Sequence, residues 1–215
     1  LTTTGSSDIG FTAVNTGTSP ITTTVVVTPG FTNGGNSNTG PTDTFTITVN
    51  PTAQIDPIDS MVVCNQDNTT AVVFTTENTG GVTTYSWTND NASIGLASSG
   101  TGTIASFTAI NVTTIAQVAN IVVTPTFENG GNSNTGSSES FTITVNPTAQ
   151  VNDQNNILIC DGSTVEEIVF TTDNTDGVTT YAWTNSNPAI GLAASGTGNI
   201  PSFIAVNDLD TSNYF

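Results

Sequence analysis

The chain has 215 residues, of which 17 are Asp or Glu and none is Lys, Arg or His, so its formal net charge is −17. Nucleic acids and anionic lipid headgroups are bound largely through cationic side chains, and this composition therefore argues against both as partners. The longest apolar runs, at 25–27 and 157–160, are only strand-sized, so we expect no direct membrane insertion of this segment.

One pattern recurs along the chain with a period of 96 residues. Phe11, Phe107 and Phe203 share this spacing, and whole phrases repeat at the same offset: NGGNSNTG, FTITVNPTAQ and GVTTY. A unit of this size corresponds to one small all-β domain and is too long for a helical solenoid or a propeller blade. We predict a tandem array, in chain order the C-terminal half of a repeat (1–50), a complete repeat (51–146) and the N-terminal part of a further repeat (147–215), taken from a longer polypeptide.

The predicted elements are strands. Large apolar residues alternate with Thr or Ser in 84–88, 105–109 and 141–145, which gives each segment one core-facing side and one solvent-facing side. Clusters of Asn, Gly, Asp and Ser between such segments favour turns. In chain order, the complete repeat is predicted to hold seven strands, near 60–64, 70–76, 82–88, 93–97, 103–110, 118–127 and 140–146. This pattern predicts an all-β, Ig-like antiparallel sandwich with almost no helix.

Each copy carries one Trp and one Cys. Trp87 and Trp183 occupy the place where Ig-type sandwiches fill the space between their sheets. Cys64 and Cys160 have no partner in their own copy, and equivalent positions in successive domains lie too far apart for a bond between them. We predict a buried thiol that packs as a small hydrophobic group, the alternative being a disulfide to another chain.

The composition argues against catalysis. A Ser or Cys nucleophile needs a general base, and the chain has no His or Lys to supply one. The phrase GTGTIA at 100–105 resembles a dinucleotide fingerprint, but it leads into a strand pattern and not into a helix, so we interpret it as a turn. The remaining carboxylate pairs are Glu166 with Glu167 and Asp208 with Asp210. Glu166 and Glu167 are adjacent, and adjacent strand residues point to opposite faces, so these two cannot form a shared site. We predict no enzymatic activity, no catalytic residue and no cofactor-binding residue.

Calcium is the one metal that the sequence leaves open. Asp56 and Asp59 follow the Pro51 junction and Asp153 follows Pro147, where carboxylates could hold a hard cation and stiffen a joint. The ligands are sparse, and a solvated acidic surface explains them as well.

Several motifs together resemble a known family. They are VCN at 63–65, the Y-x-W strand at 85–87, and the phrases SIGLASSGTGTIASF, IVVTPTFENGG and FTITVNP, which end at residues 107, 131 and 147. This combination is similar to the PKD-like repeats of very large Bacteroidetes surface proteins, among them the gliding-motility adhesins of flavobacteria, and the likeness covers essentially the whole chain.

The resemblance implies secretion by the type IX system, display on the outer membrane through regions outside this segment, and service as a long filament. Family members often have a second cysteine before the last strand; here that loop reads NGGNSNTG, which agrees with an unpaired Cys64. Asp59-Ser60-Met61 is similar to a short motif that is glycosylated on oxygen in this phylum, so Ser60 is a candidate acceptor.

Function follows from the array. Pro51 and Pro147 restrict the short joints, so we expect abutting domains that form an extended rod. We predict an extracellular filament segment that reaches an external surface or polysaccharide and cooperates with the secretion and gliding machinery of the outer membrane. The alternative is a carbohydrate-binding module of a secreted protein, with ligand contacts in loops 89–93 and 129–138; a secreted hydrolase with accessory repeats would need catalytic residues elsewhere.

The missing basic residues are explained equally by duplication of a base-poor repeat and by exposure to trypsin-like proteases.

Overall fold

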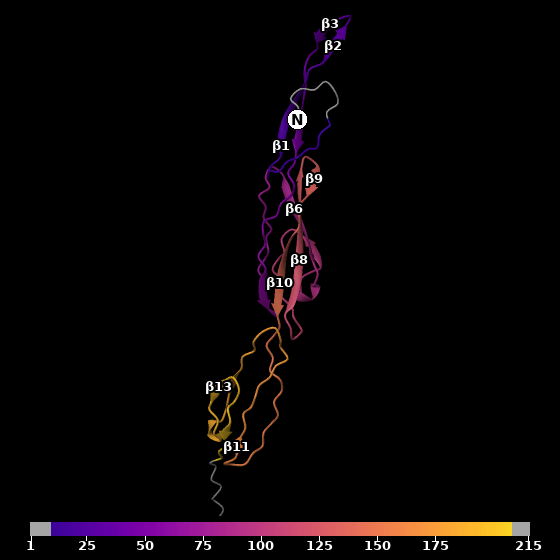
Figure 1. Cartoon of the computed structure of the whole chain (residues 1–215). Coiled ribbons are helices and arrows are strands. Elements are labelled where there is room, and N and C mark those ends of the chain that lie inside the picture. The colour runs from indigo at the N-terminus through magenta and orange to yellow at the C-terminus, as the bar shows by residue number, and fades with distance from the viewer. Residues whose placement is uncertain (1–9, 208–215) are drawn as a thin grey trace, which may run out of the picture. The chain divides into compact units, whose positions relative to one another are not determined.

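The computed structural model describes residues 10–207, and this part of the chain is built from β-strands joined by turns (Figure 1). The two helical segments in it are single 3-10 turns, η1 (Ala92–Ile94) and η2 (Pro188–Ile190). The predicted all-β class is therefore confirmed for the described residues. None of their helices is long and apolar enough to cross a membrane. The strands are β1 (Ile21–Val27), β2 (Gly30–Asn33), β3 (Asn36–Thr39), β4 (Asp43–Val49), β5 (Met61–Cys64), β6 (Val82–Asn89), β7 (Ser99–Thr101), β8 (Gln117–Asn129), β9 (Asn132–Thr135), β10 (Glu139–Asn146), β11 (Thr164–Val165), β12 (Ala182–Thr184), β13 (Ser195–Thr197) and β14 (Phe203–Ile204).

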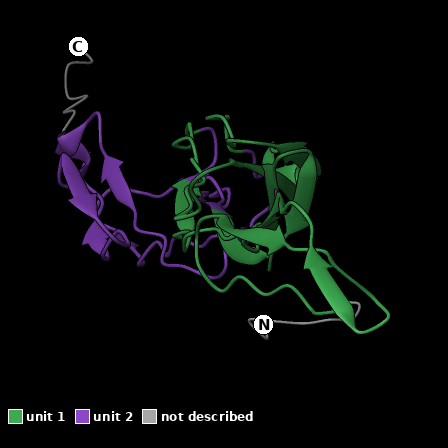
Figure 2. Cartoon of the chain, turned by 90° about the horizontal axis from the view of Figure 1, so that it is seen from above, with its two compact units in different colours: residues 1–63, 67–109, 118–144 green, residues 64–66, 110–117, 145–215 purple. Residues whose placement is uncertain are grey.

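The chain divides into two compact units (Figure 2). Within the described part, the first unit contains 10–63, 67–109 and 118–144, and the second contains 64–66, 110–117 and 145–207. Both units thus combine segments from successive 96-residue copies. The domain boundaries expected from the repeat, after residues 50 and 146, stay a prediction.

The copy at 51–146 contains a six-stranded sheet in the order β5-β10-β8-β6-β7, with β9 paired to β8 (Figure 1). Alternate residues of β8 and β10 face the interior, as the period of two predicts, and they are almost fully buried: Ala119, Ile121, Val123, Phe127, Phe141, Ile143 and Val145. Burial of a large aliphatic or aromatic side chain contributes about 1.5–3 kcal/mol, so these two strands contribute strongly to the core.

Trp87 belongs to the same core and is only 7% exposed. It lies opposite Gly100 across the β6–β7 pair, and a Cβ on that glycine would stand 2.2 Å from the indole ring. The arrangement recurs one period later, where Trp183 faces Gly196 and the corresponding distance is 2.3 Å. Glycine is required at both places because the ring occupies the space of a side chain.

Three predicted strands are wrong or reduced. Residues 93–97 contain the η1 turn, because the Asn91 side chain accepts from Ser93 N and Gly95 adopts a left-handed φ of 96° that ends it. The segments at 70–76 and 103–110 form one isolated bridge, Val72 with Ile104, and a second bridge joins Asn68, just before the first segment, to Thr108. Each keeps its predicted place without forming a continuous ladder.

The prediction of a buried thiol is wrong. Cys64 and Cys160 are both free and exposed. In β5 the exposure alternates, with Met61 and Val63 partly buried while Val62 and Cys64 face solvent. The phase of this short strand therefore places the thiol outside, and a disulfide to another chain stays a prediction.

Candidate functional site

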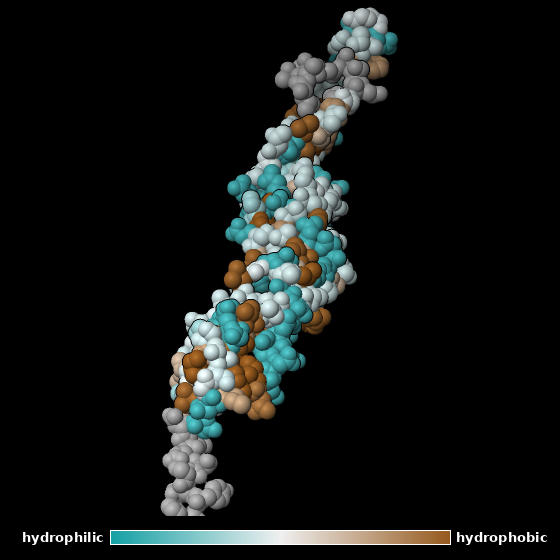
Figure 3. All heavy atoms as spheres, turned by 60° about the horizontal axis from the view of Figure 1, so that its bottom comes forward, coloured by the Kyte–Doolittle hydropathy of each residue, from teal (hydrophilic) through white to brown (hydrophobic). Residues whose placement is uncertain are grey.

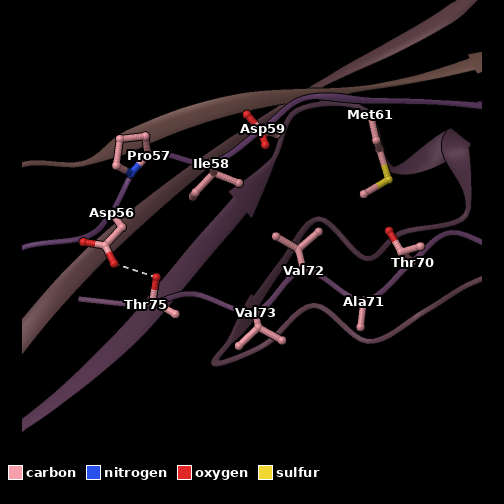
Figure 4. Close-up of a pocket in the computed structure, with 10 residues that line it drawn as sticks. All are labelled: Asp56, Pro57, Ile58, Asp59, Met61, Thr70, Ala71, Val72, Val73 and Thr75. Carbon is pink, nitrogen blue, oxygen red and sulfur yellow. Dashed lines mark hydrogen bonds between the residues drawn. The ribbon is translucent and has the colours of Figure 1, made fainter. Parts of the chain in front are cut away.

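The two carboxylates proposed for calcium in the complete copy line one shallow hollow of about 240 Å³ (Figure 4). Asp56 is held at its rim: its Oδ2 accepts from Thr75 Oγ1 at 2.6 Å, and its backbone N donates to Thr75 O at 3.0 Å. Asp59 is exposed, and the rest of the lining includes apolar side chains such as Met61 and Val72. A hard cation prefers six or more oxygen ligands, which these two carboxylates alone do not supply.

The equivalent place in the next copy shows what Asp56 does. There Asn152 N donates to Thr171 O at 2.9 Å, and Asn152 Nδ2 donates to Thr171 Oγ1 at 3.1 Å. A neutral amide thus also bonds to the hydroxyl of the equivalent threonine, with donor and acceptor exchanged, so the negative charge is dispensable for this contact.

The third candidate, Asp153, lies in the second unit and is exposed. Among residues 10–207 there is no group of three or more His, Cys, Asp or Glu side chains that could hold a metal ion. Calcium binding stays an expectation from the sequence that rests on single carboxylates.

The glycosylation candidate, Ser60, is exposed just before β5. Its Oγ accepts from Thr142 N at 3.0 Å and from Thr142 Oγ1 at 3.1 Å, so this hydroxyl also joins the start of β5 to β10. Asp56 also acts on Tyr85: burial raises the pKa of Tyr85, and the negative charge of Asp56 adds to that rise, while a hydrogen bond with Thr76 opposes it.

The residues considered for catalysis are not assembled into a site in the described part. Glu166 and Glu167 are both exposed after β11, and Glu167 Oε1 accepts from Asn199 Nδ2 at 3.0 Å. Asp208 and Asp210 lie outside the described residues. The interpretation of 100–105 as a turn is confirmed, since β7 ends within it, Gly102 has a φ of 64° and Ile104 enters a β-bridge.

The arrangement that recurs most completely is the contact between successive copies. We call the contact of 10–50 with 51–146, inside the first unit, the first joint. At its centre Asn78 Nδ2 donates to two backbone oxygens, Thr18 O at 3.4 Å and Thr52 O at 3.2 Å. Thr79 N donates to the same Thr18 oxygen at 2.9 Å, and Asn78 Oδ1 accepts from Gln54 N at 2.6 Å. One asparagine therefore connects the preceding copy, the linker and its own turn.

The second joint, inside the second unit, repeats this geometry 96 residues later. Asn174 Nδ2 donates to Thr114 O at 3.3 Å and to Thr148 O at 3.1 Å, and Asn174 Oδ1 accepts from Gln150 N at 2.8 Å. Thr175 N donates to Thr114 O at 3.1 Å. Every bond of the first joint named above thus has its counterpart, with distances that differ by at most a few tenths of an ångström.

The loop that presents the accepting Thr oxygen is itself fixed by an asparagine. Asn15 Nδ2 donates to Ser19 O and Val49 O, both at 2.8 Å. Asn111, its counterpart, is 3% exposed and makes the two equivalent bonds, to Ile115 O and to Val145 O, also at 2.8 Å. A preorganised loop loses less entropy when it contacts the next copy, which strengthens the joint.

The first joint has a further contact in which the β8–β9 hairpin takes part. Asn50 Nδ2 donates to Asn129 O at 3.0 Å, and Asn129 Nδ2 donates back to Asn50 Oδ1 at 2.9 Å. Asn134 Nδ2 donates to Pro51 O at 3.4 Å. A predicted polysaccharide loop, 129–138, is therefore partly used by the joint.

Reasoning from the sequence identified the junctions through Pro51 and Pro147 but missed the asparagines that hold them. A signal was present: the pattern Thr-acid-Asn-Thr occurs at 76–79 and again at 172–175. Asn two residues after Thr favours a side-chain-stabilised turn, and in the structure Asn78 N indeed donates to Thr76 Oγ1 at 3.1 Å.

No protein-family model matches the chain, and no curated protein matches it. The class of molecule is therefore defined by its own features: an all-β chain whose 96-residue copies are connected by a recurring hydrogen-bonded joint.

Proposed function

We propose that this chain is a non-catalytic segment of a large surface-exposed adhesin filament that serves bacterial attachment and gliding motility. In this proposal the copies are Ig-like, PKD-like sandwich domains that follow one another as a rod, outside the cell and attached to the outer membrane through other regions. The observation that carries the proposal is the recurrence of the same asparagine-centred joint at Asn78 and Asn174.

A joint of this kind supports a mechanical role. A linker with free torsions bends easily, whereas each joint here connects a copy to the loop of the preceding copy through the side chain of one residue and the backbone N–H of the next. Pro51 and Pro147 add a fixed φ on the linker itself. Repetition of such a joint limits bending between successive copies. A chain built in this way is better suited to extend over a distance than to fold back.

The surface composition supports the same proposal. No Asp or Glu of the described part is buried, so the negative charge is distributed over the surface. Like charge on neighbouring filaments keeps them apart, more strongly at low ionic strength. The absence of Lys and Arg removes every trypsin cleavage site, an advantage for a protein displayed outside the cell.

The test is made on living cells of the source organism with beads that carry antibodies against 51–146. Beads that bind and travel along the cell support a gliding adhesin, and beads that bind and stay fixed support a passive adhesive stalk in its place. Absence of binding to intact cells, together with binding after lysis, would overturn the surface assignment. Beads with pre-immune antibody measure unspecific adhesion.

A further inference from the structure

One asparagine of the first joint is followed by glycine. Asn129 closes the turn of the β8–β9 hairpin, where it pairs with Asn132. The two turn residues between them, Gly130 and Gly131, have left-handed φ angles of 63° and 77°. The other joint asparagines named above all precede a β-branched residue or proline: Asn15, Asn50, Asn78, Asn111, Asn134 and Asn174.

The residue that follows an asparagine determines how fast the side-chain amide is lost. The backbone N of that residue attacks Cγ of the asparagine, a C–N bond forms, and the amide nitrogen leaves as ammonia with the backbone proton. Water then opens the resulting cyclic imide at either carbonyl, which gives aspartate or isoaspartate. A branched side chain hinders this attack, and proline has no N–H to lose. Glycine presents no Cβ and has a permissive backbone, so Asn129 is the most reactive amide of the joint.

The joint holds this amide away from the attacking nitrogen. Asn129 Nδ2 donates to Asn50 Oδ1 at 2.9 Å, and Asn129 is partly buried and extended at the end of β8. Attack by Gly130 N requires the amide to rotate away from Asn50 and the backbone to bend. Water already reaches the turn, because Gly130 is exposed, and hydrophilic residues cover much of the face in view in Figure 3. The contact with Asn50 is therefore the barrier that the fold adds.

Loss of the amide reverses the contact between Asn129 and Asn50. A carboxylate has no N–H to donate to Asn50 Oδ1, and it repels that oxygen. Asn50 cannot compensate by turning its own amide, because its Nδ2 donates to Asn129 O at 3.0 Å and to Asn132 O at 3.4 Å. The isoaspartate product also adds a methylene group to the main chain at the residue that closes the turn, which disturbs the pairing of β8 with β9.

We propose that Asn129–Gly130 is a site of spontaneous deamidation that opens the hairpin side of the first joint irreversibly, and that the contact with Asn50 sets its rate. In the closed joint the amide is held and the reaction is slow. Each opening of the joint frees the amide to react. Once the carboxylate has formed, the joint cannot close in its original form, so the modification records that the joint has been open.

The first experiment measures the rate of deamidation in the full chain, incubated at neutral pH in the folded state and in urea. A glutamate-specific protease cleaves after Glu128 and Glu139 and releases 129–139, whose gain in mass is followed by mass spectrometry. Fragmentation locates the change at Asn129, and a zero-time sample corrects for conversion during digestion. We expect Asn129 to convert at least about tenfold more slowly in the folded chain than in urea, because reaction requires local opening.

Asn50→Ala tests whether this one contact sets the rate. Removal of the acceptor should speed conversion of Asn129 in the folded chain about fivefold to tenfold, the effect of one neutral hydrogen bond on the population of the open form. Asn68→Ala is the matched control, because Asn68 is exposed and bonds to Thr108, so its rate should equal that of the wild type. Trp87 fluorescence verifies that both variants are folded. Equal rates in the folded wild type and in urea, an unchanged rate in Asn50→Ala, or no conversion at Asn129 would each overturn the proposal.

The effect of the modification on the joint is measured with Asn129→Asp, which is the aspartate product. This substitution should lower the urea midpoint of the first unit, followed by Trp87 fluorescence in a Trp183→Phe background. In an Asn50→Ala background the same substitution should have little effect, because the oxygen that the carboxylate repels is gone. An equal loss in both backgrounds would show that the modification does not act through the joint.

Discussion

Replacement of Asn78 by Asp tests whether the joint is held as the structure indicates. The substitution keeps Oδ1 and therefore the bond from Gln54 N at 2.6 Å. It removes the amide donor to Thr18 O and Thr52 O, at 3.4 and 3.2 Å, and places an anion against those two oxygens. The change thus acts on the contact between copies and leaves the turn of Asn78 intact.

The magnitude follows from the geometry. Both lost bonds are long and partly open to water, so together they contribute about 1 kcal/mol, at the low end for neutral hydrogen bonds. Repulsion between the new carboxylate and two carbonyl oxygens adds about 1 kcal/mol in this partly buried place. We expect Asn78→Asp to lower the free energy of unfolding of the first unit by about 2 kcal/mol at pH 7.

The assay is urea denaturation followed by Trp87 fluorescence in a Trp183→Phe background. Asn68→Asp is the charge-matched control, since Asn68 is exposed and its Oδ1, which accepts from Thr108 Oγ1, is retained. Below the ordinary Asp pKa of about 3.9 the protonated carboxyl can donate one hydrogen bond again, so the difference should shrink at low pH. If Asn78→Asp is no more destabilising than Asn68→Asp at pH 7, the joint does not hold the copies as argued.

Three further predictions concern packing, backbone strain and pH. Gly100→Ala should cost about 3 kcal/mol in urea denaturation, because its Cβ would stand 2.2 Å from the buried Trp87 ring; no loss would contradict this packing. Asp176→Gly should raise stability by about 1 kcal/mol, because Asp176 has a φ of 60° where its counterpart Gly80 has 74°; a lower melting temperature would contradict the strain. Above about pH 10 the unfolded chain loses the Tyr85 proton before the folded chain does, since burial raises the folded pKa, so stability should fall with rising pH through the folded pKa. Tyr85→Phe should flatten that fall in melting temperatures, and an unchanged profile would contradict it.

The buried face of a strand could be predicted from the sequence wherever apolar residues alternate strictly with Thr or Ser. The buried face of β10, with Phe141, Ile143 and Val145, follows from alternation with Thr. The burial of Trp87 follows in the same way from alternation along β6. These positions are decided locally, because a residue in a paired strand has only two faces to choose from.

The misses have physical reasons of two kinds. Met61, Val62, Val63 and Cys64 are consecutive apolar residues, so the pattern contains no phase, and the observed phase exposes Cys64. At η1 the local signals of Asn91 and Gly95 outweighed an apolar run that suggested a strand. The joint could not be predicted in detail, because Asn78 and Thr18 are distant in sequence and meet only once both turns have formed.

The absence of cations determines how this chain can hold its copies together. Without Lys, Arg or His no side-chain ion pair can form, so contact between copies has to use neutral groups, and the described joints use amide side chains and backbone oxygens. The exchange of Asp56 for Asn152 in one conserved contact shows that even a carboxylate serves here as a hydrogen-bonding group. Added salt therefore weakens the electrostatic repulsion between separate chains, but it leaves the hydrogen bonds of the neutral joints almost unchanged. Cohesion along the chain and separation between chains are thus controlled by different interactions, and mutation can alter the surface charge without loosening the joints.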